Sequence, residues 1–179
     1  MKKFLSILTL MGVFAVGNAQ KKLQPTDEGS KVHFVIKNLG INTGGDLTGV
    51  KGSIVLNEKK PTASSADVTV NVSTIDTDNE RRDGHLNRED YFDVARFPTM
   101  RIKSTSITAG TGAGNYNFAG TLTIKDVTKN ISFPFSVVPS GANYMFTGGF
   151  SINRLDYGIG KESATMSDDV KVSLQVVAK

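Results

Sequence analysis

Apolar residues alternate with polar ones along most of the chain after residue 30, and this period of two constrains the fold more than any other feature. Val32, Phe34 and Ile36, for example, are separated by His33 and Val35 and flanked by lysines. Such alternation is typical of a strand with one buried face and one face in water. Similar stretches recur near residues 47–56, 67–73, 100–105, 116–124, 131–137, 145–153 and 170–176. Eight strands joined by short turns predict an all-β domain, built as an antiparallel barrel or sandwich.

The exception to the alternation is the segment from Asp78 to Asp93. Its apolar residues are scattered among charged ones, and Asp78 or Asn79 can cap a short helix whose first turn includes Glu80. Pro98 then favours an extended backbone in the residue before it. We therefore expect a short helical excursion at one end of the sheet, before the fourth strand.

Residues 1–19 have the layout of a secretory signal peptide. Lys2 and Lys3 precede an apolar run, and Gly17 and Ala19 are small residues at the expected cleavage positions. The run is shorter than the roughly 20 residues that a membrane-spanning helix needs, and no second run of this kind follows. The sequence thus predicts a periplasmic or secreted protein, with residues 20–179 forming a single domain.

Charge and cysteine content exclude several classes of partner. Lys2 and Lys3 are two of the 21 basic residues, so residues 20–179 carry 19 basic against 17 acidic residues, and the whole-chain net charge of +4 falls to +2. No block of Lys or Arg supports binding to nucleic acid. The chain contains no cysteine, which excludes disulfides, thiol nucleophiles and an acyl anchor on cysteine.

Motifs for catalysis and metal binding are weak. The chain has two histidines, of which His33 falls on the polar side of its strand. His85 lies close to Asp83, and this pair is the only candidate acid/base site, with a network that fixes the helical excursion as the alternative interpretation. The spacings fit neither a zinc site nor a calcium loop, so neither a metal nor a cofactor is expected.

The predicted inner face is apolar and contains no charged residue. Its members, taken as the expected ligand-binding wall, are Phe34, Ile36, Ile54, Val70, Val72, Met100, Ile102, Leu122, Phe133, Phe135, Phe150 and Ile152. A barrel of about eight strands either fills its interior with side chains or holds one ligand, and the periodicity leaves both options open. A cavity with such walls would suit an acyl or isoprenoid chain.

Several motifs in order resemble those of the YceI-like family, known as lipid- or polyisoprenoid-binding proteins. The opening strand reads Ser30-x-Val32-x-Phe34-x-Ile36-Lys37-Asn38-Leu39-Gly40, and the other matching segments are residues 74–79, 82–86, 90–94, 97–99, 104–105, 120–129 and 152–159. The resemblance implies an eight-stranded antiparallel lipocalin-like barrel from an exported bacterial protein, with an apolar tunnel for the ligand. Two positions depart from it: Asn38 stands where many relatives carry histidine, and Asp126 where glycine is usual.

The resulting hypothesis is an exported carrier that holds a long-chain isoprenoid or other amphipathic lipid inside the barrel. Asn38, Arg82 and His85 are the candidate contacts for the polar head of the ligand or for the mouth of the tunnel. A lipid is the expected partner, and a homodimer is left open. The alternatives are an enzyme that acts on such lipids through His85 and Asp83, and a filled barrel that serves as a stress-related interaction module.

Overall fold

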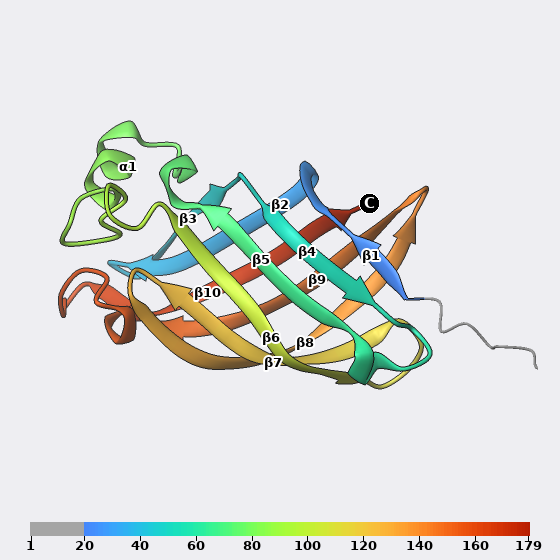
Figure 1. Ribbon diagram of the computed structural model, residues 1–179. Helices are drawn as coiled ribbons and strands as arrows, with labels where there is room; N and C mark the ends of the chain where they lie inside the picture. The colour runs from blue at the N-terminus through green and yellow to red at the C-terminus, as the bar shows by residue number, and fades with distance from the viewer. Residues whose placement is uncertain (1–19) are drawn as a thin grey trace, which may run out of the picture.

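The computed structural model describes residues 20–179, which form ten β-strands and one α-helix (Figure 1). The predicted signal peptide lies outside the described residues. The strands are β1 (Lys21–Leu23), β2 (Pro25–Asn38), β3 (Ile41–Leu47), β4 (Lys51–Leu56), β5 (Ser65–Asn71), β6 (Thr99–Ala109), β7 (Asn115–Ile124), β8 (Val127–Ser140), β9 (Asn143–Asn153) and β10 (Met166–Ala178). All neighbours are antiparallel, in the order β1-β4-β5-β6-β7-β8-β9-β10-β2-β3. The predicted all-β, barrel-like fold is confirmed.

The sheet has ten strands where the alternation predicts eight. The additional strands are β1, which has only three residues, and β3, whose sequence Ile-Asn-Thr-Gly-Gly-Asp-Leu does not alternate. β3 forms because Leu39 and Gly40 make a two-residue turn in which both residues have positive φ, 52° and 78°. This turn matches the twist of a hairpin and returns the chain along β2.

Curling of the sheet brings its two ends together. β1 pairs with β4, whereas β2, which follows after Gln24, pairs with β10, so the chain itself crosses from one end of the sheet to the other. Gln24 and Lys179 exchange two backbone hydrogen bonds at this point, of 2.7 and 3.0 Å. Further along, the Asp27 carboxylate accepts a hydrogen bond from the Val50 N–H at 2.7 Å, which ties β2 to the start of β4.

The helical excursion is the helix α1 (Glu80–Leu86), and it lies before the fourth predicted strand, β6, as expected. Asn79 caps it, since its Oδ1 accepts a hydrogen bond from the Arg82 N–H at 3.0 Å. A short 3-10 turn, η2 (Val72–Thr74), ends β5 and leads toward the helix. Helix α1 and the loop after it lie beside one end of the barrel, at the left in Figure 1.

Buried apolar side chains gather in two clusters inside the curled sheet. The larger contains Ile54, Phe118 and Phe133, and it lies toward the end of the barrel where the chain crosses from β1 to β2. The smaller contains Leu122 and Tyr157, and it is packed against aromatic residues of the loop that follows α1. Members of both clusters line the candidate functional site.

Candidate functional site

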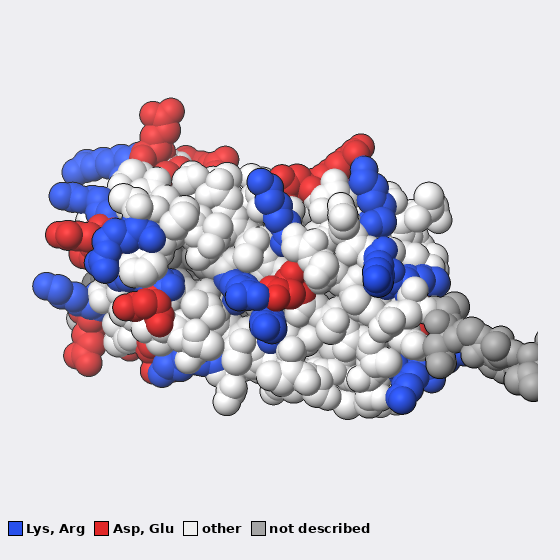
Figure 2. Space-filling view, viewed as in Figure 1, with Lys and Arg blue, Asp and Glu red and all other residues white. Residues whose placement is uncertain are grey.

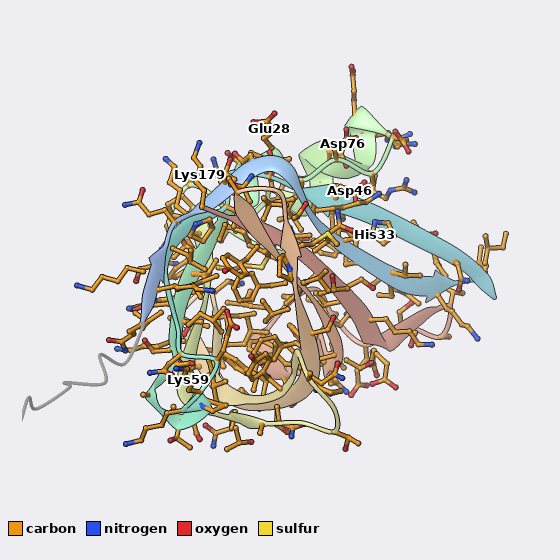
Figure 3. The ribbon with its side chains drawn as sticks, turned by 90° about the vertical axis from the view of Figure 1, so that its right-hand side faces the viewer. Glu28, His33, Asp46, Lys59, Asp76 and Lys179 are labelled. Carbon is orange, nitrogen blue, oxygen red and sulfur yellow. The ribbon has the colours of Figure 1, made fainter. Side chains whose placement is uncertain are left out.

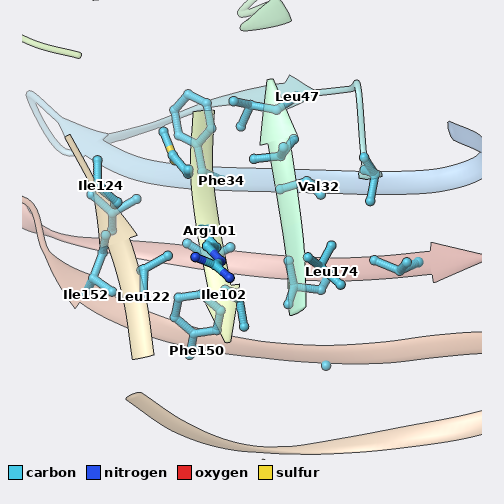
Figure 4. A pocket seen from close by; sticks show the side chains of 18 of the residues that line it. Val32, Phe34, Leu47, Arg101, Ile102, Leu122, Ile124, Phe150, Ile152 and Leu174 are labelled. Atoms are coloured by element: carbon cyan, nitrogen blue, oxygen red, sulfur yellow. The ribbon is translucent and has the colours of Figure 1, made fainter. Parts of the chain in front are cut away.

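An apolar cavity of about 290 Å³ runs through the interior of the barrel. Side chains from facing strands enclose it, and Figure 4 shows Phe34, Leu122 and Phe150 among those that converge on it. A water-sized sphere occupies about 10–15 Å³, so the volume of about 290 Å³ equals roughly 20 to 30 such spheres. The barrel is therefore hollow over part of its length.

The alternation seen in the sequence is what directs these side chains inward. On β10, Val172 pairs with Phe34 of β2 on one side and with Phe150 of β9 on the other, and all three side chains line the cavity. Their neighbours Lys171 and Ser173 are exposed on the outer face. Because successive side chains of a strand point to opposite faces, one alternating pattern supplies both the wall and the exterior.

Eleven of the twelve predicted wall residues line the cavity. They are Phe34, Ile36, Ile54, Val70, Met100, Ile102, Leu122, Phe133, Phe135, Phe150 and Ile152. Val72 does not, although it is only 2% exposed, because β5 ends at Asn71 and the η2 turn carries Val72 out of the strand register. The placement of Val72 therefore differs from the prediction.

Aromatic rings form the wall around the larger buried cluster. The Phe133 ring lies 4.8 Å from that of Phe118 and 5.0 Å from that of Phe150, measured between ring centroids. Gly148 leaves room for the side chains of Phe133 and Phe135, because a Cβ at this position would lie 3.0 Å from the Phe135 Cβ and 3.2 Å from the Phe133 ring. Gly148 is a wall residue that the pattern of apolar side chains does not reveal, since a glycine carries no apolar signal.

Polar groups enter the cavity wall beside α1. Arg82 is the principal one, and its guanidinium donates from Nε to the Thr77 hydroxyl at 2.7 Å and from Nη2 to the Thr77 carbonyl at 2.6 Å. Among residues 20–179 no carboxylate lies within ion-pairing distance of this guanidinium. Asn38, at the end of β2, also lines the cavity. Two of the three predicted head-group residues thus border the same space.

His85, the third predicted head-group residue, does not line the cavity. Its side chain is exposed, and its ring packs against that of Tyr91 with 4.7 Å between centroids. The Asp83 carboxylate accepts hydrogen bonds from the Thr77 N–H at 3.0 Å and from the Thr77 hydroxyl at 2.5 Å. Because helix residues two positions apart point in different directions, His85 and Asp83 serve separate packing roles. The geometry brings neither of them to the cavity as an acid/base pair.

Arg154, from the motif at residues 152–159, has a different environment from Arg82. It is 2% exposed, and its three guanidinium nitrogens donate to the carbonyl of Ser167 (3.0 Å), the carbonyl of Ile159 (2.9 Å) and the carboxylate of Asp168 (2.8 Å). These bonds join the turn η3 (Leu155–Tyr157) to the start of β10. The hydrogen-bonding pattern explains why this motif contains a buried charge.

Burial also affects the tyrosine of that turn. Tyr157 is 2% exposed, and burial raises the pKa of its phenol, with a further contribution from the adjacent Asp156 carboxylate. The phenol therefore stays neutral to higher pH than an exposed tyrosine.

Within residues 20–179, no cluster of three or more His, Asp or Glu side chains has a geometry suited to a metal ion. Nor does any helix in that range have the length and apolarity needed to cross a membrane.

A curled antiparallel sheet around an apolar cavity, with a few arginines in its lining, places this chain among the lipocalin-like binding folds. The comparison with family models is more specific. The chain belongs to the YceI-like family, because the model of the YceI-like domain matches residues 22–178.

Known relatives and solved structures agree with this assignment. A UPF0312 protein of Pseudomonas aeruginosa (strain LESB58) is 29% identical and covers 98% of this chain and 97% of its own length. A UPF0312 protein of Yersinia pestis (strain Pestoides F) is also 29% identical, over 96% and 93%. The crystal structure of Burkholderia cenocepacia BcnA is similar, with a TM-score of 0.79, 26% identity and coverage of 84% and 96%.

A more distant structure shares the fold alone. It is described as a polyisoprenoid binding domain from Saccharophagus degradans implicated in plant cell wall breakdown. Its TM-score is 0.69 at 15% identity, and the match covers 88% of this chain and 97% of that one.

Proposed function

We propose that this protein is an exported carrier that holds a long-chain isoprenoid or another amphipathic lipid in its barrel cavity. The observation that carries the proposal is the polarity of that cavity. Its wall is almost entirely apolar, and among the arginines that line it within residues 20–179, Arg82 on α1 is the one without a carboxylate partner. A ligand that matches this arrangement has an apolar chain and a polar or anionic head.

The two parts of such a ligand would be held by different forces. Burial of the chain against Phe34, Phe133 and Phe150 stabilises the complex by roughly 25 cal/mol for each Å² removed from water. The guanidinium of Arg82, held in place by Thr77, still has donors available for a phosphate, carboxylate or carbonyl oxygen. The apolar chain of the ligand would thus supply affinity, and the head group of the ligand would set the direction of binding.

Family membership supports the proposal. One solved structure of the same fold is described as a polyisoprenoid binding domain, and the cavity of this chain suits a ligand of that class. Export is proposed from the sequence of residues 1–19, so the carrier would act in the periplasm or outside the cell. A filled barrel that acts only through its surface agrees less well with a cavity of about 290 Å³.

An enzyme that uses His85 and Asp83 is the other alternative. Neither side chain lines the cavity, and each has its own contact, with Tyr91 and Thr77 respectively. A general acid or base has to reach the group that it protonates. The carrier therefore fits the geometry better than the enzyme.

Filling the cavity tests the proposal directly. Val172 projects into the cavity between Phe34 and Phe150, so Val172→Phe should occupy the space that the lipid needs. Ser173→Phe is the matched control, because Ser173 is the next residue of the same strand and lies exposed on the outer face. Both variants and the native protein would be titrated with a detergent-dispersed polyprenol and examined by native mass spectrometry.

The expected result is a lipid adduct on the native protein and on Ser173→Phe, with the adduct lost or strongly reduced on Val172→Phe. Circular dichroism would show that all three proteins are folded. Absence of any adduct on the native protein, or an undiminished adduct on Val172→Phe, would refute the proposal of a ligand inside the barrel.

A further inference from the structure

The tip of the β2–β3 hairpin exposes two large apolar side chains. Leu39 is 72% exposed and Ile41 is 70% exposed, and the next most exposed large apolar residue, Val138 on β8, is 49% exposed. Figure 3 shows the two strands of this hairpin extending away from the rest of the barrel. A single exposed leucine needs no explanation, but two together at a projecting tip indicate an interaction site.

The backbone makes Leu39 unusual. Its φ of 52° lies in the left-handed region, which asparagine and glycine adopt far more readily than leucine. Packing does not compensate, because the tip is open: a Cβ placed on the adjacent Gly40 would meet nothing within 4 Å. The Leu39 N–H donates to the Thr165 carbonyl at 2.8 Å, but this backbone bond does not require a leucine side chain, which is left free to contact something outside the chain.

The exposed tip is continuous with the cavity wall. Ile41 pairs with Asn38 across the hairpin, and in β3 it shares a face with Thr43 and Leu47. Asn38, Thr43 and Leu47 all line the cavity. One face of the β2–β3 ribbon therefore runs from the exposed tip into the interior of the barrel.

Within the hairpin the charge next to the tip is positive, and the neighbouring strand β10 adds Asp168, which pairs with Arg154, and Asp169. Lys37 precedes Asn38, and the stretch from residue 29 to residue 45 contains no acidic residue. Lys37 forms no ion pair in the part of the chain that the structure describes. On the face shown in Figure 2, the end of the barrel around α1 carries basic and acidic side chains together. A cation beside exposed apolar side chains matches the phosphate layer and the hydrocarbon of a lipid bilayer.

We propose that the β2–β3 tip inserts into the surface of a phospholipid bilayer. Leu39 and Ile41 enter the hydrocarbon boundary while Lys37 stays at the level of the phosphates. The ribbon face then forms the path along which a lipid passes between bilayer and cavity, a step that rests on the proposed carrier function. The bilayer contact itself requires only the tip.

A tryptophan placed at the tip would report insertion. The chain contains no tryptophan, so a single substitution gives an emission signal without background. Ile41→Trp is the reporter, and Val138→Trp, at the exposed apolar position on β8, is the control. Vesicles of phosphatidylcholine and phosphatidylglycerol should shift the emission of Ile41→Trp to the blue, and brominated lipids should quench it. Val138→Trp should show neither effect.

A second variant separates membrane contact from folding. Leu39→Asn combined with Ile41→Thr removes the apolar tip, and it places at position 39 a residue that favours the left-handed conformation. The variant should therefore be at least as resistant to heat as the native protein. Its partition onto the same vesicles should fall about tenfold for each side chain lost. Uptake of a polyprenol from vesicles should slow, whereas uptake from detergent should be unchanged.

The outcomes separate the two proposals. An emission of Ile41→Trp that vesicles do not change, or a shift equal to that of Val138→Trp, would overturn the bilayer contact. A blue shift that depends on protein concentration without vesicles would overturn it too, and would identify a second copy of the chain as the occupant. Failure of the carrier proposal alone would look different: the tip would bind vesicles, but no lipid would enter the cavity from either source.

Discussion

Two of the arginines that line the cavity, Arg82 and Arg154, differ in their surroundings, and the comparison between them shows how to interpret a charge in an apolar interior. Arg154, in the turn before β10, donates from all three of its guanidinium nitrogens to Ser167, Ile159 and Asp168. Arg82, on α1, directs two nitrogens to Thr77 alone. Both guanidinium groups have five N–H donors, so the difference lies in how many acceptors the fold supplies.

The comparison also assigns roles within the motif residues. Asn153, next to Arg154, accepts a hydrogen bond from the Leu155 N–H at 2.9 Å, and Asp156 pairs with Lys129 at 3.2 Å. The polar side chains around Arg154 thus stabilise the turn to which they belong. Around Arg82 the turn is held by Asp83 instead, which leaves the arginine in the wall with unused donors. The number of acceptors around a buried polar group therefore separates a structural residue from a candidate for ligand binding.

The largest effect expected from this comparison is on stability. Arg154→Ala leaves the buried Ile159 carbonyl without its donor and weakens the links to β10, and it should lower the free energy of unfolding by about 3 kcal/mol. Arg82→Ala should lower it by about 1 kcal/mol, because Asp83 still holds Thr77. Urea denaturation followed by circular dichroism measures both values. Equal losses for the two variants would contradict the assignment of structural and ligand-facing roles.

The next effect concerns the ligand. Arg82→Gln removes the charge and should weaken binding of a detergent-dispersed isoprenyl phosphate by about tenfold, the usual contribution of a charge-assisted hydrogen bond. Binding of the corresponding alcohol should change little. Fluorescence displacement measures both affinities, and Arg82→Lys, which keeps the charge without the planar fork, should lie between Gln and the native residue. If phosphate and alcohol lose affinity equally, Arg82 does not face the head group.

The wall of the cavity could be predicted from the sequence, and the assignment of its polar residues could not. Strand residues such as Phe34 and Phe150 line the cavity because the period of two is a local property that the sheet preserves. Val72 is an exception because η2 ends the strand one residue before it, a boundary that alternation does not mark. The alternation does not indicate β3 for a related reason, since its two glycines interrupt the pattern of apolar side chains.

The roles of Arg82, His85 and Arg154 depend on contacts between residues far apart in the chain or on the direction of a helix face. Arg154 is explained by Ser167 and Asp168, thirteen and fourteen positions away. His85 faces Tyr91 rather than the cavity because of its place on α1. No spacing rule applied to the sequence contains this information. The charged motif residues could therefore be recognised, but their structural and ligand-binding roles could not be told apart.

A smaller effect concerns the phenol in the Arg154 turn. Burial raises the pKa of Tyr157, whereas an unfolded tyrosine loses its proton near pH 10. As the pH rises above about 10, the unfolded chain ionises first, and the stability of the folded protein falls until the raised pKa is passed. Tyr157→Phe should reduce this alkaline loss, measured as urea midpoints at about pH 8 and about pH 10.5. Tyr116, whose pKa is also raised by burial, should still cause part of the fall in stability at alkaline pH in the Tyr157→Phe variant.

The smallest effect is expected at a third arginine of the cavity lining, Arg101, whose ion pair with Asp67 is exposed. Arg101 donates from Nε and Nη2 to the two oxygens of Asp67, at 2.7 and 2.5 Å, and this hydrogen bonding lowers the pKa of the Asp67 carboxyl. The pair contributes stability above the unfolded pKa of about 3.9, and that stability is lost as the pH falls through the lower folded value. Because the pair is exposed, Asp67→Asn should change the urea midpoint at neutral pH much less than Arg154→Ala does.

Added salt provides the control for this last comparison. It should erase the difference between Asp67→Asn and the native protein, because an exposed ion pair is screened, whereas the loss in Arg154→Ala should persist. The physical reason is the acceptor set: two of the three acceptors of Arg154 are backbone carbonyls, whose bonds do not depend on a mobile counter-charge. If salt restored Arg154→Ala, the turn before β10 would be held by long-range charge rather than by these hydrogen bonds, and the contrast with Arg82 would no longer hold.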